Sequence, residues 1–392
     1  MFKGQLFSGV CKFIDRATSF CGCGVSVHFD FLAGQEDHPM AYLVGDFGNN
    51  ILPPSGTVID GEPENFLFGD TDGTLFPPNA GGNDTLTGGA FSSFNFLFGD
   101  ADVIKNGAAG GDDFLTGGVN ATSNELYGDA DLMKNGAVGG DDSLTGGADS
   151  FGNLLYGDAK TMRNRSEGGD DTLTGGASSD FNDLYGDAQV MNSSSGGSDD
   201  LTGSSNANAN GLHGDAYEMI SSRGGDDSLT GGDASLTNAL WGDASIMRKG
   251  ARGGDDTLTG GADSQRNDLY GDAETMRGGS KGGDDRLISG ADAEDHMWGD
   301  FRTSDGTVRG GNDTFVFGPS NGTDHIHDFQ QGRDTIELRE IDNVASFADL
   351  DIESVDADQD GSLDSIVRFD DSNSITVYNV AALTRCDFEI LV

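Results

Sequence analysis

Single leucines flanked by glycine, aspartate and asparagine recur along most of the chain, at a spacing of 28 to 30 residues. Each repeat holds two short apolar pieces, N-x-L-(Tyr/Phe/Trp/His)-G-D and G-G-D-D-x-L-T-G-G. Only about three to five residues separate the glycines, so each piece is long enough for a strand and too short for a helix. The pattern therefore predicts an all-β chain built from one repeated unit.

The leucine of each piece is expected to point inward, because alternate side chains of a strand face opposite ways. One repeat cannot bury its own leucines, whereas stacked repeats can. We therefore expect a parallel β-roll, or β-solenoid, of about nine repeats with a small β-rich C-terminal cap. The predicted inward columns are Leu86, Leu115, Leu144, Leu173, Leu201, Leu229, Leu258 and Leu287 on one sheet, and Leu67, Leu97, Leu126, Leu155, Leu184, Leu212, Leu240 and Leu269 on the other.

A longer connection runs from each G-D-A to the next G-G-D-D and usually carries a methionine. This column is typical of a loop that folds back to plug the end of the core, and an adaptable binding stripe is the alternative. The methionines are Met133, Met162, Met191, Met219, Met247 and Met276.

The chain carries 22 lysines and arginines against 67 aspartates and glutamates, a net charge of −45. So acidic a chain repels a phosphate backbone, which argues against nucleic-acid binding. No stretch of about 20 apolar residues exists that could span a membrane as a helix. The charge opposes a compact state unless cations offset it.

Aspartates recur beside the glycines at fixed positions, where tight turns aim backbone carbonyls inward. Calcium takes six to eight oxygens of mixed carboxylate and carbonyl type. Carboxylates stacked about 4.8 Å apart repel, and interleaved divalent ions reverse that repulsion. The second aspartate of the G-G-D-D pieces gives the candidate ligands Asp84, Asp113, Asp142, Asp171, Asp199, Asp227, Asp256, Asp285 and Asp313. The first aspartate of the same pieces adds Asp112, Asp141, Asp170, Asp226, Asp255 and Asp284.

These segments resemble the RTX, or haemolysin-type, calcium-binding repeats, whose nonapeptide is G-G-x-G-x-D-x-L-x. The resemblance covers about residues 41–392 and implies a parallel β-roll with multiple calcium ions in its turns. Every second turn departs from the family by carrying Asn, as at Asn153 and Asn182. We therefore expect one side to bind calcium, and the other to bind weakly or to be held by Asn and the G-D-A aspartates. Turn caps are the equal alternative for these aspartates, which are Asp100, Asp129, Asp158, Asp187, Asp215, Asp243 and Asp272.

The segment 310–341 and the final residues CDFEILV resemble the end of type I secreted proteins. This implies an uncleaved C-terminal signal, transit through the type I secretion machinery, and calcium-driven folding outside the cell or at its surface. The predicted organisation is a short N-terminal segment (1–40), the calcium-binding roll (41–318), and a cap that carries the secretion signal (319–392).

A second candidate calcium loop lies in this C-terminal segment. Asp356, Asp358 and Asp360 resemble the start of an EF-hand loop, although Val367 stands where the bidentate Glu is expected. A solvated acidic turn is the alternative interpretation.

Catalysis is not expected, since the sequence contains neither HExxH nor GxSxG and only about 40 residues precede the repeats. His325 and His327 alternate in a predicted strand, where an exposed strand face is favoured over a metal site. Cys11, Cys21 and Cys23 are interpreted as thiols of a short N-terminal segment, with a metal or redox bond as the alternative.

The principal prediction is a secreted calcium-binding repeat protein. A carbohydrate-binding adhesin or surface-layer or matrix component is the alternative, because extracellular polysaccharide could stack on an outward aromatic row. A secretion module left from a secreted hydrolase is a further alternative. The candidate glycan face is Tyr127, Tyr156, Tyr185, Trp241 and Tyr270, for which ordinary β-propensity is the competing explanation.

Overall fold

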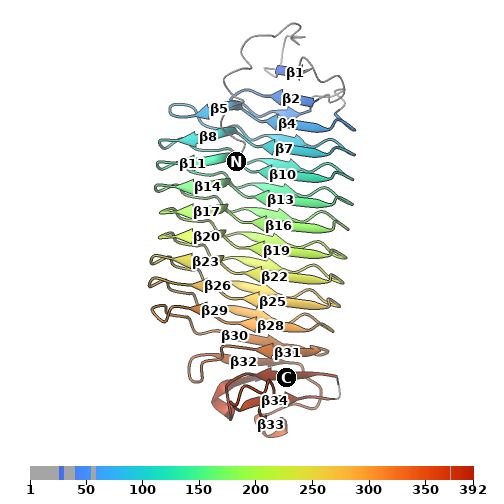
Figure 1. Ribbon diagram of the computed structural model, residues 1–392, viewed down its shortest axis with the longest axis vertical. Helices are drawn as coiled ribbons and strands as arrows, with labels where there is room; N and C mark the ends of the chain where they lie inside the picture. The colour runs from blue at the N-terminus through green and yellow to red at the C-terminus, as the bar shows by residue number, and fades with distance from the viewer. Residues whose placement is uncertain (1–25, 31–39, 54–58, 371) are drawn as a thin grey trace.

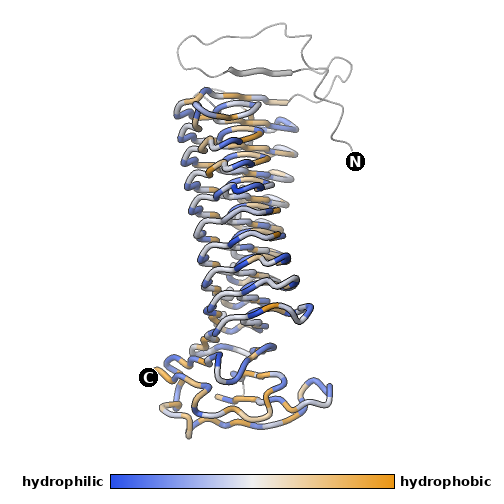
Figure 2. The backbone as a smooth tube through the Cα atoms, turned by 90° about the vertical axis from the view of Figure 1, so that its left-hand side faces the viewer, coloured by the Kyte–Doolittle hydropathy of each residue, from blue (hydrophilic) through white to orange (hydrophobic). Residues whose placement is uncertain are grey.

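A computed structural model describes residues 26–30, 40–53, 59–370 and 372–392. Its chain winds into a solenoid whose turns stack along one axis, with the C-terminal segment at one end (Figures 1 and 2). Cys11, Cys21 and Cys23, together with most of the predicted N-terminal segment, lie outside the described residues.

Three sheets run along the solenoid, and each full turn gives one short strand to each sheet. Sheet A contains, in spatial order, β1 (Ser26–Asp30), β2 (Met40–Val44), β4 (Glu64–Phe68), β7 (Phe94–Phe98), β10 (Ser123–Tyr127), β13 (Gly152–Tyr156), β16 (Phe181–Tyr185), β19 (Ala209–His213), β22 (Thr237–Trp241), β25 (Arg266–Tyr270), β28 (Asp295–Trp298), β31 (Thr323–Ile326), β35 (Ser374–Val377), β34 (Asp364–Arg368) and β33 (Asp351–Val355). Sheet B contains β3 (Ile51–Leu52), β6 (Thr85–Thr87), β9 (Phe114–Thr116), β12 (Ser143–Thr145), β15 (Thr172–Thr174), β18 (Asp200–Thr202), β21 (Ser228–Thr230), β24 (Thr257–Thr259), β27 (Arg286–Ile288), β30 (Thr314–Phe317), β32 (Thr335–Arg339) and β36 (Phe388–Leu391). Sheet C contains β29 (Phe301–Ser304), β26 (Ala273–Met276), β23 (Ala244–Arg248), β20 (Ala216–Ile220), β17 (Ala188–Asn192), β14 (Ala159–Arg163), β11 (Ala130–Lys134), β8 (Ala101–Lys105) and β5 (Thr71–Leu75).

Sheets A and B enclose the predicted leucine core. Leu126 of β10 lies beside Leu155 of β13, and Leu144 of β12 lies beside Leu173 of β15, so each leucine stacks on its equivalent one turn away. Every leucine of both predicted columns is fully buried, and together they form one continuous apolar cluster. The predicted parallel solenoid and its inward columns are therefore confirmed.

Sheet C corrects the prediction for the methionine connection. The residues after G-D-A form a strand rather than a loop plug, and Met133 pairs in register with Met162. The methionines are fully buried with the alanines of G-D-A in a second apolar core, separate from the leucines. In β11 and β14 the two buried positions are three residues apart, so the alternation that reveals sheets A and B does not reveal sheet C.

A return arm closes this second core. In one turn the chain reverses at Asn135 and Gly136, both with positive φ, and the arm then places Ala137 against the methionines. Single bridges, such as the one between Arg223 and Arg252, link the arms of successive turns. Each turn thus has two halves, with leucines between sheets A and B and methionines between sheet C and the arm.

The C-terminal residues extend sheets A and B beyond the last full turn. β31 and β35 continue sheet A in parallel, and the antiparallel strands β34 and β33 complete it. β32 and β36 continue sheet B. Two short 3-10 helices, Phe347–Asp349 and Arg385–Asp387, interrupt this segment. Among the described residues there is no helix long and apolar enough to cross a membrane.

Candidate metal centre

Two columns of buried aspartates lie at the boundary between the two halves of each turn. The G-D-A aspartate follows sheet A directly and precedes sheet C, whereas the second G-G-D-D aspartate lies between the return arm and sheet B. All are at most 3% exposed. The G-D-A aspartates were expected on the opposite side of the roll, and that expectation was wrong. Because sheet C folds back through the arm, it brings the two columns together.

Each second G-G-D-D aspartate uses only one carboxylate oxygen for hydrogen bonding. The backbone N–H of Asp113 donates to Oδ1 of Asp142 at 2.6 Å, and the same contact repeats from Asp84 to Asp313 at 2.5 to 3.0 Å. The predicted register of this column is therefore present. Oδ2 of every member is buried without a hydrogen-bond partner among the described residues.

The G-D-A aspartates follow the same rule. The N–H of Gly169 donates to Oδ1 of Asp158 at 3.1 Å, and the N–H of Gly111 donates to Oδ2 of Asp100 at 3.0 Å. The other oxygen of each of these carboxylates is buried and unpaired within the described part of the chain. The turn-cap interpretation therefore accounts for one oxygen of each carboxylate and leaves the other unexplained.

Glycines bring backbone carbonyl oxygens to the same place. A Cβ on Gly99 would lie 1.7 Å from the carbonyl oxygen of Gly128 and 1.9 Å from Oδ2 of Asp113. At Gly128 the corresponding distances are 1.6 Å to the carbonyl of Gly157 and 2.0 Å to Oδ2 of Asp142. Only glycine fits here, and the absent side chain lets an unpaired carboxylate oxygen and a carbonyl oxygen converge.

Burial raises the pKa of these carboxylates when no cation is present. It raises the pKa of Asp158 and Asp215 from 3.8 to about 7. Burial also raises the pKa of Asp129, and the neighbouring charges of Asp142 and Asp100 raise it further. A buried charge needs a partner, and unpaired carboxylate oxygens beside carbonyls are the ligands that calcium takes. The residues present therefore fit a column of calcium ions held between the aspartates.

At the opposite edge of the leucine core, a ladder of asparagines forms hydrogen bonds from turn to turn. Nδ2 of Asn124 donates to Oδ1 of Asn153 at 2.9 Å, and Oδ1 of Asn124 accepts from the N–H of Gly118 at 2.8 Å. The ladder runs from Asn65 to Asn267 and ends on Asp295. An amide both donates and accepts, so the asparagines on this side pair with one another from turn to turn. It contains none of the G-D-A aspartates.

The first aspartate of each G-G-D-D piece lies outside the double column. These side chains are exposed, and the N–H of Asp170 donates to Oδ1 of Asp141 at 3.0 Å in a separate outer row. The structure therefore separates the two aspartates that the sequence analysis grouped together. Asp112, Asp141, Asp170, Asp226, Asp255 and Asp284 form the exposed set.

The EF-hand-like loop gathers three aspartates. Ligand atoms of Asp356, Asp358 and Asp364 lie within 4.8 Å of one another, and Oδ1 of Asp356 is buried without a partner in the described residues. Asp360 is not part of this group, and its Oδ1 accepts the N–H of Ser362 at 2.7 Å. Asp364 ends the EF-hand-like run of the sequence but was not counted among its candidate ligands, although it stands at the ninth position of the loop, which is a ligand position in EF-hands.

The aromatic row is buried except for the half-buried Trp241, and its stacking contradicts the predicted glycan face. Its rings stack on one another along the solenoid, with centroids 4.5 Å apart for Phe98 and Tyr127 and 4.3 Å apart for His213 and Trp241. Tyr156 is fully buried, and the Lys160 ammonium lies 5.9 Å from the centre of its ring. Each ring face is covered by the next ring, so no face is available to stack on a sugar. The predicted residues Tyr127, Tyr156, Tyr185, Trp241 and Tyr270 all belong to this stack.

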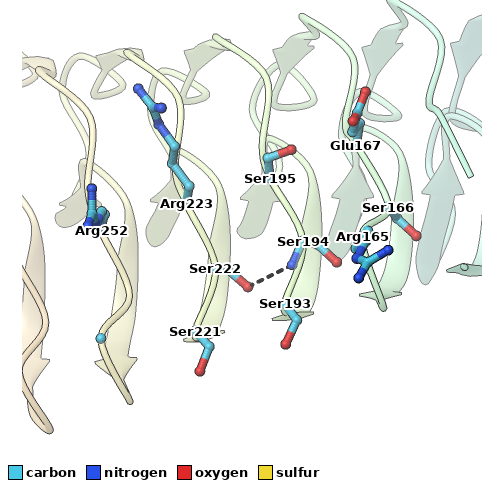
Figure 3. Close-up of a pocket in the computed structure, with 11 residues that line it drawn as sticks. Arg165, Ser166, Glu167, Ser193, Ser194, Ser195, Ser221, Ser222, Arg223 and Arg252 are labelled. Carbon is cyan, nitrogen blue, oxygen red and sulfur yellow. Dashed lines mark hydrogen bonds between the residues drawn. The ribbon is translucent and has the colours of Figure 1, made fainter. Parts of the chain in front are cut away.

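A shallow depression lies instead on the return arms (Figure 3). Exposed Arg165, Arg223 and Arg252 line it together with the hydroxyls of Ser193 and Ser221. In this acidic chain the depression offers three guanidinium groups on three of four consecutive turns, together with the carboxylate of Glu167.

Stacked parallel turns, a repeat of 28 to 30 residues and buried acidic columns define the class as an acidic β-solenoid of the RTX type. The family model described as Peptidase M10 serralysin C terminal matches residues 165–392, more than half of the chain. The chain therefore belongs to this family, which is the non-catalytic C-terminal repeat part of serralysins. The predicted RTX-type repeat is thereby confirmed. No curated protein and no solved structure matches the chain.

Proposed function

We propose that this protein is a secreted repeat protein that folds by binding several calcium ions outside the cell. The observation that carries the proposal is the double column of buried aspartates, in which nearly every carboxylate keeps one unpaired oxygen. Without cations these charges lie in a medium that cannot solvate them, so the fold requires calcium or protons. The loop of Asp356, Asp358 and Asp364 provides a further calcium site in the C-terminal segment.

The secretion route follows from the same chemistry. Low calcium inside the cell keeps the acidic columns repelled and the chain unfolded, which suits export of an unfolded chain. Extracellular calcium modules commonly bind at about 10⁻⁴–10⁻³ M, so folding follows release. Secretion from a host with a type I exporter tests the C-terminal signal. The full chain should be exported, and a chain lacking residues 386–392 should remain inside.

Calcium titration of chelator-treated protein at pH 7 tests the central proposal. We expect a cooperative gain of β signal in far-UV circular dichroism, and metal analysis of the folded protein should find several ions per chain. Magnesium serves as the control, because it demands octahedral geometry and dehydrates reluctantly. A full β signal under chelator at pH 7 would show that the apolar cores hold the solenoid alone, and the proposal would be wrong.

We further infer that the repeats bind and stabilise rather than catalyse, which agrees with the non-catalytic family and with a module that once accompanied a secreted hydrolase. Polysaccharide binding remains the second candidate, now supported by the depression in Figure 3 rather than by aromatic stacking. Guanidinium groups bind carboxylates and sulfates well, so the expected ligand is an acidic polysaccharide. Sedimentation with such a polysaccharide should be lost when Arg223 and Arg252 are both changed to Glu.

A further inference from the structure

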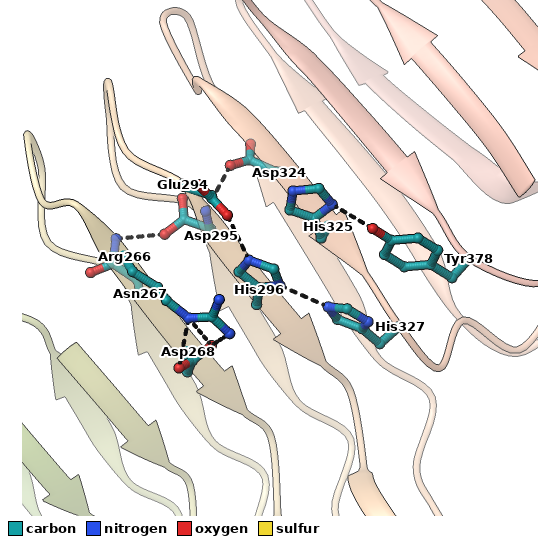
Figure 4. A network of polar contacts seen from close by, with 10 residues as sticks. All are labelled: Arg266, Asn267, Asp268, Glu294, Asp295, His296, Asp324, His325, His327 and Tyr378. Carbon is teal, nitrogen blue, oxygen red and sulfur yellow. Dashed lines mark hydrogen bonds and ion pairs between the residues drawn. The ribbon is translucent and has the colours of Figure 1, made fainter. Parts of the chain in front are cut away.

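Three histidines and a glutamate gather on the outer face of sheet A, at the end of the repeats (Figure 4). His296 lies in β28, and His325 lies directly opposite it in β31. Glu294 precedes β28, and His327 follows β31. The prediction that His325 and His327 lie on an exposed strand face was wrong, because both are partly buried and bonded to neighbours.

The ligand atoms of Glu294, His296 and His325 lie within 4.8 Å of one another. Nε2 of His296 is 2.9 Å from Oε1 of Glu294, and the rings of His296 and His325 stack with centroids 4.5 Å apart. Two imidazole nitrogens and one carboxylate oxygen are a donor set that zinc and its neighbours in the first transition row take in proteins. The Glu294 side chain is 50% exposed, so an ion can enter from solvent.

The second nitrogen of each imidazole is already occupied by a neighbour. Nδ1 of His296 is 3.0 Å from Nε2 of His327, and Nδ1 of His325 is 3.0 Å from the hydroxyl of Tyr378. Metal-binding histidines almost always have such a partner, which fixes the ring and its tautomer. The nitrogen that remains on each ring is Nε2, and at His296 a bound metal ion would replace the proton that Nε2 shares with Glu294.

The local charges suit a cation. The Glu294 carboxylate is half exposed and lies beside the imidazole of His296, so the cluster presents an acidic oxygen to an incoming ion. The nearby guanidinium of Arg266 is paired with Asp268 at 2.7 Å, and this ion pair offsets its charge.

The repeats themselves show that the solenoid does not require this cluster. The residues at the position of His296 in the three preceding turns are Asp268, Ala239 and Gly211. The cluster also lies on the outer face of sheet A, whereas the aspartate columns lie inside between the two apolar cores. It is therefore a local feature at the junction between the last repeat and the C-terminal segment.

We propose that Glu294, His296 and His325 bind one first-row transition-metal ion, with zinc as the best match. Tyr378 and His327 are positioning residues that hold the two ligand imidazoles. Since His325 and Tyr378 belong to the C-terminal segment and His296 to the last repeat, the ion ties the two together. This site is independent of the calcium columns, because its nitrogen donors select against calcium.

Full-length protein, alkylated at its cysteines and saturated with calcium, is titrated with Co²⁺ and then with Zn²⁺. We expect one Co²⁺ per chain, with the visible absorption of a low-coordinate cobalt site, and full displacement by Zn²⁺. Glu294→Gln and His325→Ala should abolish this binding. Tyr378→Phe removes one hydroxyl only and should weaken Zn²⁺ binding by about 10–100-fold, the usual effect of an outer-shell partner. Glu274→Gln, a partly exposed glutamate of β26, is the matched control and should bind as the wild type does.

The circular dichroism of each variant in calcium identifies any that fails to fold, and the wild-type titration does not depend on the variants. Absence of saturable Co²⁺ and Zn²⁺ binding to the calcium-saturated wild type would overturn the proposal. Unchanged binding in folded Glu294→Gln or folded His325→Ala would also overturn it. Tyr378→Phe with wild-type affinity would remove its positioning role.

Discussion

Replacement of one column aspartate by asparagine should have opposite effects with and without calcium. Asp158 is fully buried, its Oδ1 accepts the N–H of Gly169, and its Oδ2 has no partner among the described residues. Asp158→Asn keeps the accepting oxygen and the side-chain shape, but it removes the charge. The variant therefore tests the charge of the column separately from its packing.

The pKa of Asp158 gives the size of the effect. Burial is the main cause that raises it from 3.8 to about 7. A carboxylate with a raised pKa keeps its proton in the folded state at a pH where the unfolded state has lost it, so its contribution to stability falls as pH rises from about 4 to about 7. With 1.36 kcal/mol for each pKa unit, the neutral amide should stabilise the calcium-free fold by about 4 kcal/mol at pH 7. This advantage should vanish toward pH 4, where the carboxylate is neutral in both states.

The assay compares Asp158→Asn with Asp170→Asn, which changes an exposed aspartate of the same turn. In chelator, the pH at which β signal appears on acidification should be higher for Asp158→Asn than for the wild type. In calcium, the same variant should need more calcium to fold, since it has lost a carboxylate ligand. Asp170→Asn should match the wild type in both titrations. If Asp158→Asn were less stable than the wild type in chelator as well, the buried charge would not be the obstacle to folding and the reasoning would fail.

Three further outcomes follow from the same structure. The chelated wild type should gain β structure as the pH falls from 7 toward 4, because protons neutralise carboxylates whose pKa is raised; circular dichroism that stays flat over this range would contradict it. Asn182→Asp replaces the Nδ2 donor to Asn210 with a second acceptor, so the free energy of unfolding in urea should fall by roughly 3 kcal/mol, and calcium should not restore it. Rescue by calcium would mean that the asparagine side binds ions. Met162→Ala should cost about 2–5 kcal/mol in urea unfolding with calcium present, whereas Thr161→Ala on the same strand should change little; equal effects would argue against a second packed core.

The leucine columns could be predicted because their signal is complete in the sequence. A lone apolar residue between glycines alternates with polar neighbours, and its recurrence every turn identifies both sheet faces. Sheet C gave no comparable signal. Its buried positions are Ala159 and Met162, three residues apart, and alanine alone does not mark a core position. The methionine therefore pointed to a loop, although it belongs to a strand.

The metal centre was only half predictable for the same reason. The spacing of Asp142, Asp171 and their equivalents was sufficient to place them in one column. The position of Asp158 beside them depends on the path of the chain through sheet C and the return arm, which the sequence did not reveal. The aromatic row was correctly predicted on the outer face of its strands, because side chains alternate between the two faces of a strand. This alternation gives no information on whether equivalent rings of successive turns stack on one another, as Tyr156 and Tyr185 do.

The two edges of the leucine core differ in one side-chain atom, which is the Nδ2 donor of asparagine at one edge and the Oδ2 acceptor of aspartate at the other. At Asn153 the amide Nδ2 donates to Oδ1 of Asn182 in the next turn of the solenoid, and Oδ1 accepts the N–H of Gly147. Each added turn therefore supplies a hydrogen-bond acceptor to the asparagine of the turn before it. At Asp142 the same position of the side chain carries Oδ2 instead of an N–H donor, and stacking another turn adds another charge without a partner. A solenoid with asparagine at both edges would close its hydrogen bonds unaided and could fold inside the cell. Under the proposed function, aspartate along one edge makes folding depend on the cation concentration of the surroundings, because only a cation or a proton can complete the column.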